Sequence, residues 1–296
     1  WIGDLRLQAL ANYYSIKNYD LVKRCLYLFA GLPEDNGQIG ACLFLEPKLL
    51  VDDTVLFDYS LFFVSILHDY YLETKDESTL NDLWPTALKQ IELALSRVDE
   101  TGIVKDTEDW WSFTDWHPDL NKQTPAQAVL IYTMKQGKVL SEILNDEYST
   151  KYLEENIKFT SNAALEYLFD KEKGLFISGK EKQISWASQA WMVLAEVFNK
   201  DENAKLLDRL FKVNPKINMI TPYMYHHLIE ALIISDKKEK ALELIRSYWG
   251  EMLKDGVWEL YNPENKFESP YGSNLINSYC HAWSCTPTYF IRKYFI

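Results

Sequence analysis

The order of hydrophobic and polar residues along the chain has a helical period almost throughout, and strand-like alternation is nearly absent. Residues 57–74 are apolar on almost every side, as in a helix that is buried all round. Residues 79–98 instead carry apolar side chains at steps of three and four, with Lys, Gln, Glu and Arg between them. This pair predicts an inner helix followed by an outer helix with one solvated face.

The inner and outer pair recurs along the chain. The predicted helices are residues 5–17, 20–32, 57–74, 79–98, 126–144, 152–169, 186–198, 204–213, 223–235, 238–253 and 279–295. This alternation predicts an all-α fold, an (α/α)6 barrel or six-hairpin toroid. An open α-solenoid is the alternative, but its repeats are more uniform in length. Because twelve helices close such a ring, we expect one domain over residues 1–296 that lacks its first helix.

Three long connections separate an outer helix from the next inner helix: residues 33–56, 106–123 and 259–278. Since they occupy equivalent places in the repeat, they are expected on one rim of the ring. Binding and catalytic residues are often found on loops that a rigid scaffold positions. The rim is therefore where we expect the functional site.

Composition narrows the classes of ligand. The chain has 296 residues, 47% of them hydrophobic, and a net charge of −12. This charge disfavours nucleic acid, and no apolar run has the length of a membrane helix. Nucleotide-binding and zinc-binding motifs are absent, so no cofactor and no metal are expected. A neutral ligand suits the chain best, and the 10 Trp and 19 Tyr offer stacking surfaces for a sugar.

The second long connection combines indoles with carboxylates. Its residues of interest are Asp109, Trp110, Trp111, Asp115, Trp116, His117 and Asp119. Indole rings stack on the apolar faces of sugars, while carboxylates accept hydrogen bonds from sugar hydroxyls. The alternative is a structural lid in which the indoles pack on the helix ends. The residues alone leave both interpretations open.

Several single residues at the rim are candidates. Glu259 lies beside Trp258, where partial desolvation would favour a general base, and His281 begins the last predicted helix. Asp4 and Asp58 stand at the starts of inner helices, where capping is the simplest role. A cap at that position also faces the mouth of the barrel, so it remains compatible with ligand binding.

Five motifs resemble one family along essentially the whole chain. They are W-I-G-D at 1–4, F-D-Y at 57–59, T-D-W at 114–116, G-V-W-E at 256–259 and C-H-A-W-S-x-T-P-T-Y at 280–289. Together they resemble the catalytic domain of inverting bacterial α-L-rhamnosidases. The resemblance implies an (α/α)6 barrel and a substrate, small molecule or glycan, with a terminal rhamnose.

The resemblance also implies a division of catalytic roles. Glu259 matches the general base of single-displacement hydrolysis. Trp1 and Asp4 match the end of the family motif D-E-R-x-G-W-x-G-D, in which the aspartate binds rhamnose. The general acid of that motif would then lie upstream of Trp1, so the catalytic domain is expected to be truncated at its N-terminus. A chain with only the base would be slow on natural rhamnosides, yet active on aryl rhamnosides.

Further substrate contacts follow from the matched motifs. Trp116 matches a tryptophan that contacts the sugar, and His281 matches a histidine that does so. Asp58 and Asp115 lie in matched motifs and are expected contacts as well. The family implies accessory domains upstream. The usual location of family members is the only basis for expecting a periplasmic or extracellular location.

Two alternatives remain open. Another (α/α)6 carbohydrate enzyme, such as an unsaturated glucuronyl hydrolase or a polysaccharide lyase, acts on anionic sugars and calls for Arg and Lys at the rim. A noncatalytic toroid that binds glycan would keep its affinity when Glu259 is replaced and would never show turnover.

Overall fold

The computed structural model describes residues 1–296, and all eleven predicted helices are present. They are α1 (Ile2–Tyr13), α2 (Tyr19–Ala30), α3 (Phe57–Thr74), α4 (Glu77–Leu95), α5 (Gln123–Ile143), α6 (Glu147–Ala163), α7 (Trp186–Leu194), α8 (Lys200–Val213), α9 (Pro222–Ile234), α10 (Lys238–Met252) and α11 (Pro287–Tyr294). A π-helical segment, η1 (Ala164–Leu168), follows α6, and a 3-10 helix, η2 (Ala282–Cys285), precedes α11. No helix is both long and apolar enough to cross a membrane.

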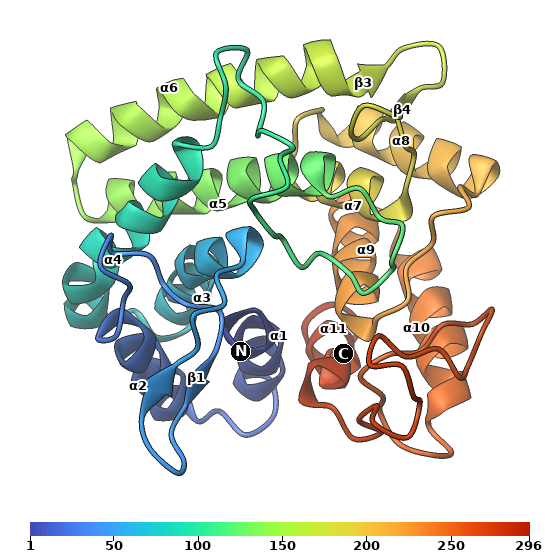
Figure 1. Ribbon diagram of the computed structural model, residues 1–296, viewed down its shortest axis with the longest axis horizontal. Coiled ribbons are helices and arrows are strands. Elements are labelled where there is room, and N and C mark those ends of the chain that lie inside the picture. The colour runs from blue at the N-terminus through green and yellow to red at the C-terminus, as the bar shows by residue number, and fades with distance from the viewer.

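The helices form a closed ring in two layers (Figure 1). Helices α1, α3, α5, α7 and α9 contact one another in this order, and η2 contacts both α9 and α1. Helix α11 packs on α1 beside η2, so six inner positions close the ring. The outer helices α2, α4, α6, α8 and α10 pack on these inner helices. This closed ring is the predicted (α/α)6 barrel and rules out the open solenoid.

The burial of α7 and α8 explains the alternation in the sequence. All nine residues of α7 are buried, because inner helices have neighbours on every side. In α8 the buried residues are Asn203, Leu206, Leu207 and Leu210, the spacing of a single apolar stripe. A capping box between Asn199 and Glu202 starts this outer helix by satisfying exposed backbone N–H groups.

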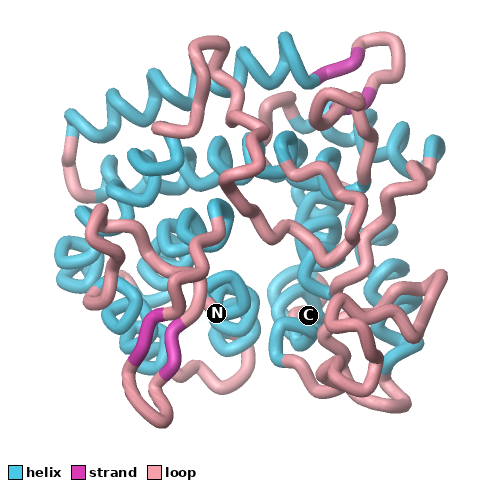
Figure 2. The backbone as a smooth tube through the Cα atoms, in the orientation of Figure 1, coloured by secondary structure: helices cyan, strands magenta, loops and turns pink.

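The three longest connections lie on one rim, as predicted, and appear as pink tubes across the face turned to the viewer in Figure 2. They cover residues 31–56, 96–122 and 253–281. The first contains the antiparallel hairpin β1 (Leu43–Phe44) and β2 (Leu50–Val51). A second short hairpin, β3 (Phe169–Asp170) and β4 (Leu175–Phe176), connects η1 with α7.

The predicted helix 279–295 is wrong in its first part. The backbone at Cys280 forms a bridge to Val257, and the N–H of His281 donates to the Val257 carbonyl at 2.7 Å. This pairing keeps the segment extended, and the regular helix begins only at Pro287, a residue suited to a helix start. Gly256 permits the pairing: its φ is +131°, and a Cβ there would lie 2.2 Å from the Tyr279 carbonyl oxygen.

Candidate active site

A cavity of about 250 Å³ lies on the rim, where α1, the start of α3 and two long connections meet. Its walls are formed by Trp1, Asp4, Leu56, Tyr59, Trp111, Phe113, Trp116, Glu259, Tyr271, His281 and Trp283. Drug-sized ligands occupy roughly 300–1,000 Å³, so this smaller space suits a ligand of about one sugar ring. The structure brings together five of the predicted site residues here: Trp1, Asp4, Trp116, Glu259 and His281.

Glu259 is fixed by hydrogen bonds to both of its carboxylate oxygens. The Tyr271 hydroxyl donates to Oε1 at 2.5 Å, and the backbone N–H of Ser278 donates to Oε2 at 3.1 Å. The Glu259 backbone N–H also donates to the Ser278 carbonyl, and Trp283 Nε1 donates to the Glu259 carbonyl. The carboxylate is only 8% exposed and faces the cavity from a wall braced on two sides.

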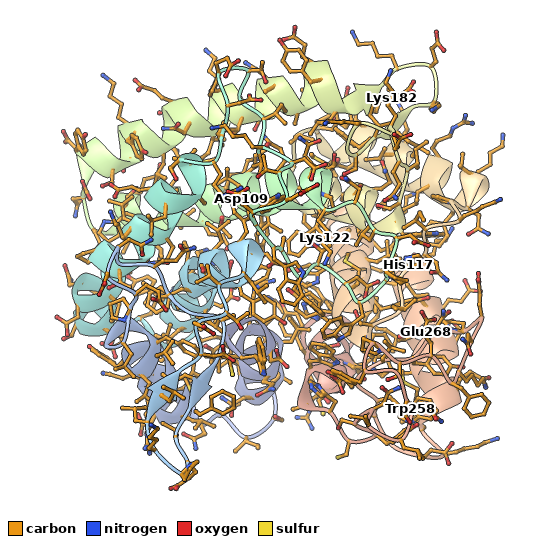
Figure 3. All side chains as sticks on the ribbon, viewed as in Figure 1. Asp109, His117, Lys122, Lys182, Trp258 and Glu268 are labelled. Atoms are coloured by element: carbon orange, nitrogen blue, oxygen red, sulfur yellow. The ribbon has the colours of Figure 1, made fainter.

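Trp258, which was predicted to desolvate Glu259, does not line the cavity. Its ring packs edge-on against Tyr261 and Tyr279, among the C-terminal loops (Figure 3). The aromatic neighbours of Glu259 at the cavity are instead Tyr271 and Trp283.

Asp4 lies in the first turn of α1 and does not cap it, because the N-cap position is occupied by Trp1 and no side chain caps there. The Tyr59 hydroxyl donates to Asp4 Oδ2 at 3.3 Å. Burial raises the pKa of Asp4 above its ordinary value. Gly3 makes this contact possible, because a Cβ at that position would come within 2.3 Å of the Tyr59 ring.

His281 presents an N–H to the same carboxylate. Its Nε2 lies 3.7 Å from Asp4 Oδ1, while Nδ1 accepts from the Trp283 backbone N–H at 3.4 Å. Burial lowers the pKa of His281, so the ring is neutral at pH 7, and the accepting Nδ1 leaves the proton on Nε2. Asp4, Tyr59 and His281 thus form one polar edge of the cavity, with donors and acceptors for sugar hydroxyls.

Indole and phenyl rings form the rest of the cavity wall. Trp116 packs edge-on against Phe113, with ring centroids 5.1 Å apart, and against Tyr271 at 5.8 Å. Trp1 is half exposed and meets the Tyr59 ring edge-on. These rings pack against one another and also border the cavity. Both interpretations of the indole-rich connection, stacking on a sugar and structural packing, therefore remain compatible with them.

Asp58 and Asp115 lie behind the wall of the cavity and do not line it. Asp58 accepts from the backbone N–H groups of Phe113 and Thr114 at 2.9 and 2.8 Å. Asp115 accepts from the N–H of Ile220 at 2.9 Å and from the Thr221 hydroxyl at 2.6 Å. Their carboxylates tie the second long connection to α3 and to the start of α9, so their expected direct contact with substrate does not fit this geometry.

Burial has the largest effect on the pKa values of both aspartates. It raises the pKa of Asp58 and raises that of Asp115 to about 6, because neutral donors offset desolvation only in part. Asp58 is not the N-cap of α3, which is Leu56, but it also accepts from the N–H of Tyr59 in the first turn of this helix.

Six cavity residues were not among the predicted site residues: Leu56, Tyr59, Trp111, Phe113, Tyr271 and Trp283. Tyr59 lies within the F-D-Y motif and Trp111 within the indole-rich connection, so a signal existed for both. Nothing in the sequence pointed to Tyr271, which stands 12 residues from Glu259 in an irregular loop. The structure brings together no group of three or more His, Cys, Asp or Glu side chains that could hold a metal ion.

Solved structures place this fold among carbohydrate-active enzymes. A rhamnosidase from Klebsiella oxytoca with rhamnose bound is 46% identical, with a TM-score of 0.97, over 100% of this chain and 58% of that chain. A GH78 family rhamnosidase of Bacillus sp. GL1 is 22% identical, with a TM-score of 0.83, over 99% of this chain and 31% of that chain. The chain therefore spans less than two thirds of the length of either rhamnosidase.

A more distant likeness shows the fold alone. The GH63 mannosylglycerate hydrolase from Thermus thermophilus in complex with Tris is 14% identical, with a TM-score of 0.75, over 98% of this chain and 92% of that chain. No curated protein matches the sequence. Residues 1–295 match the family described as the bacterial alpha-L-rhamnosidase 6 hairpin glycosidase domain. Because this match spans nearly the whole chain, the chain belongs to that family.

Proposed function

We propose that the chain is the larger part of the catalytic domain of a glycoside hydrolase that releases terminal α-L-rhamnose with inversion. One observation carries this proposal: a ring-sized cavity combines a fixed carboxylate, Glu259, with a polar edge at Asp4 and an aromatic wall. Rhamnose is a neutral 6-deoxy sugar, and its methyl group suits the apolar wall. The bound rhamnose in the Klebsiella oxytoca relative supports the same choice of sugar.

In the proposed reaction Glu259 is the general base. It takes a proton from a water molecule whose oxygen bonds to the anomeric carbon, on the face opposite the leaving group. As the bond to the glycosidic oxygen breaks, a general acid protonates that oxygen. We propose that this acid lies upstream of Trp1, as the family motif implies. Asp4 and His281 hold sugar hydroxyls, and Trp1 and Trp116 pack against the ring.

The charge of the cavity argues against enzymes for anionic sugars. No Lys or Arg is among the residues that line it, whereas Asp4 and Glu259 are. A uronate would therefore meet two carboxylates and no cation, which disfavours an unsaturated glucuronyl hydrolase or a polysaccharide lyase. A noncatalytic glycan-binding toroid remains the second candidate, because a sugar cavity alone does not require turnover.

The test uses 4-nitrophenyl α-L-rhamnopyranoside, because nitrophenolate leaves without a proton and the measurement does not depend on the general acid. Proton NMR records which anomer of rhamnose forms first, and β-rhamnose is expected. Glu259→Gln is expected to lower kcat by roughly 10²- to 10⁴-fold, the usual contribution of general base catalysis. Glu264→Gln is the matched control, because Glu264 lies in the same connection but is exposed.

Three outcomes decide between the candidates. Loss of turnover in Glu259→Gln, with rhamnose binding retained in calorimetry, supports the hydrolase. Rhamnose binding without turnover in the unchanged chain supports the glycan-binding toroid. α-Rhamnose as the first product, or full activity of Glu259→Gln, would overturn the proposed mechanism.

A further inference from the structure

The connection that begins at Glu259 folds back onto that residue. The Glu259 N–H donates to the Ser278 carbonyl at 2.8 Å, and the Ser278 N–H donates to Glu259 Oε2 at 3.1 Å, so residues 259–278 form a closed loop. We call these residues the Glu259 loop. Tyr271 lies in its outer part, and the Tyr271 hydroxyl donates to Glu259 Oε1 at 2.5 Å. The proposed reaction gives no role to the residues that hold the loop in this shape.

Hydrophobic packing does not hold the outer part of the Glu259 loop. Phe267, Leu275 and Ile276 are exposed, although they are its large apolar residues. Tyr271 is partly exposed as well, and its ring meets Trp116 only edge-on, with ring centroids 5.8 Å apart. Burial of apolar surface is the usual source of order in a folded chain. In this loop, polar contacts supply that order instead.

Glu268 joins the two arms of the loop (Figure 3). Its Oε2 accepts from the side-chain amide of Asn262 at 2.5 Å, and its backbone carbonyl accepts from the side-chain amide of Asn277 at 2.8 Å. Both asparagines are buried. A hydrogen bond to a carboxylate is stronger than one between neutral groups, so the bond to Asn262 contributes most. Glu268 thus fixes the two arms relative to each other, three residues before Tyr271.

The outgoing arm of the loop is anchored to the barrel. The Tyr261 N–H donates to the Ile220 carbonyl at 3.0 Å, and the Tyr248 hydroxyl donates to the Tyr261 carbonyl at 2.8 Å. Asn262 follows directly in the chain, so Glu268 is bonded to a part of the loop that the barrel holds. Loss of the Glu268 side chain would therefore free the outer part of the loop, while the loop stays closed where it meets the barrel.

We propose that Glu268 is a positioning residue for the proposed hydrolysis: it holds the Glu259 loop so that the Tyr271 hydroxyl contacts the Glu259 carboxylate. Glu268 does not line the cavity, so it acts through Tyr271. This proposal rests on the proposed function, because it takes Glu259 as the general base.

Kinetics on 4-nitrophenyl α-L-rhamnopyranoside tests the proposal. Glu268→Ala is expected to lower kcat/KM about tenfold, as loss of the Tyr271 hydrogen bond would, with the same division between kcat and KM as Tyr271→Phe. Glu268→Gln should recover most of this loss, because its amide oxygen can still accept from Asn262. Glu264→Ala is the matched control, because Glu264 is exposed in the same loop and its side chain forms no hydrogen bond.

A double variant shows whether Glu268 acts through Tyr271. In the Tyr271→Phe background, Glu268→Ala is expected to change kcat/KM by less than about twofold, because the bond that Glu268 positions is already absent. A full tenfold loss in that background would show an independent effect on the fold and would overturn the proposal. Unchanged kcat/KM in Glu268→Ala would also overturn it. An equal loss in Glu268→Gln would do so as well, because the charge of Glu268 would then act and not its hydrogen bond.

Trypsin cleavage after Lys266 tests the same loop without turnover. Lys266 is exposed in the Glu259 loop, and cleavage requires a segment that can detach from the fold. Cleavage, located by mass spectrometry, is expected to be at least about threefold faster in Glu268→Ala than in the unchanged protein, Glu268→Gln or Glu264→Ala. Equal rates would overturn the proposal. Absence of turnover in the unchanged protein would instead overturn the proposed function.

Discussion

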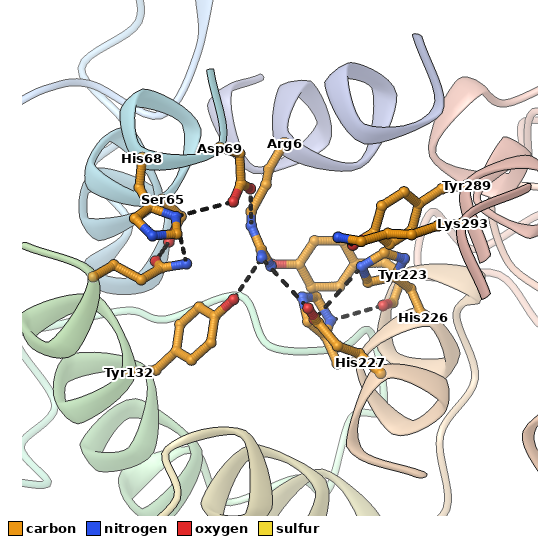
Figure 4. Close-up of polar contacts among 12 residues, drawn as sticks. Arg6, Ser65, His68, Asp69, Tyr132, Tyr223, His226, His227, Tyr289 and Lys293 are labelled. Carbon is orange, nitrogen blue, oxygen red and sulfur yellow. Dashed lines mark hydrogen bonds and ion pairs between the residues drawn. The ribbon is translucent and has the colours of Figure 1, made fainter. Parts of the chain in front are cut away.

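Carboxylates are buried in two regions of this barrel, and they differ in their partners. Beneath the rim connections, Asp58 and Asp115 accept hydrogen bonds only from neutral backbone and hydroxyl groups. Deeper in the ring, Asp69 lies beside Arg6, whose Nε donates to Asp69 Oδ2 at 3.3 Å (Figure 4). Asp58 and Asp69 belong to the same helix, about 16 Å apart at 1.5 Å per residue.

The pKa shifts follow the partners. Burial raises the pKa of Asp58 and Asp115, and neutral donors compensate only in part. Burial acts on Asp69 as well, but the charge of Arg6 and the hydrogen bond of His68 outweigh it and lower the pKa. Asp69 in the middle of the ring is therefore an ion at neutral pH, whereas Asp115 behind the rim, with a pKa of about 6, is close to taking up a proton.

The polar side chains around Arg6, which we call the inner cluster, are largely closed to solvent, in contrast to the cavity. Arg6 is 2% exposed; its Nη2 donates to the Tyr132 hydroxyl at 2.6 Å and lies 3.9 Å from Glu230 Oε1. His226 and His227 are fully buried beside it, and burial lowers the pKa of both well below the ordinary value. The inner cluster holds four inner helices together, while the cavity leaves its polar edge free for a ligand.

The largest expected effect comes from removing the cation of the inner cluster. Arg6→Met leaves Asp69 and Glu230, each only 14% exposed, without their nearest cation, and such losses cost about 3–5 kcal/mol of unfolding free energy. Urea unfolding followed by circular dichroism measures this. Lys200→Met is the control, because its partner Asp236 is exposed and such a surface pair contributes about 1 kcal/mol or less. Equal losses in the two variants would contradict the contrast between them.

The contributions of the two kinds of carboxylate to the unfolding free energy should change with pH in opposite directions. The folded pKa of Asp115, about 6, lies above the unfolded value, so its contribution is full below pH ~4 and is lost as pH rises through 6. The unfolding free energy of the unchanged protein, minus that of Asp115→Asn, should fall over this window by about 3 kcal/mol.

Asp69→Asn provides the matched comparison. The folded pKa of Asp69 is lowered, so its contribution is present above the unfolded value and is lost as pH falls through the folded value. The difference between the unchanged protein and Asp69→Asn should therefore decrease toward acid pH. Denaturant titrations from about pH 2 to 8 measure both variants, because the Asp69 effect falls below pH ~4 and the Asp115 effect above it. Slopes of the same sign would refute the distinction.

The smallest expected effect concerns the rim. Tyr271→Phe removes the hydroxyl that donates to Glu259 Oε1, and kcat/KM for the aryl rhamnoside is expected to fall about tenfold, since water can replace part of a hydrogen bond to a charged group. Stability should change by less than about 0.5 kcal/mol, because Tyr271 is 43% exposed. Tyr167→Phe, also on the surface, is the control. A loss of stability as large as the loss of activity would show that Tyr271 acts only through the fold.

The sequence alone determined the layers of the barrel and the place of its loops. Burial on every side or along one stripe leaves a regular signature every 3.6 residues, so α7 and α8 could be told apart before any contact was known. The same regularity placed the three long connections on one rim. The last predicted helix failed at its start, because that extended segment depends on pairing with Val257, more than 20 residues away.

Tertiary structure decided which rim side chains face the cavity. Loop residues have no period, so the sequence could nominate Glu259 but did not find Tyr271 and Trp283, which donate hydrogen bonds to it. Asp58 and Asp115 were predicted as ligand contacts because the identity of an acidic residue does not show whether its side chain faces a cavity or accepts hydrogen bonds from the backbone. The physical reason is the range of the interactions: periodic burial acts over neighbouring turns, whereas the site is assembled from segments that meet only when the ring closes.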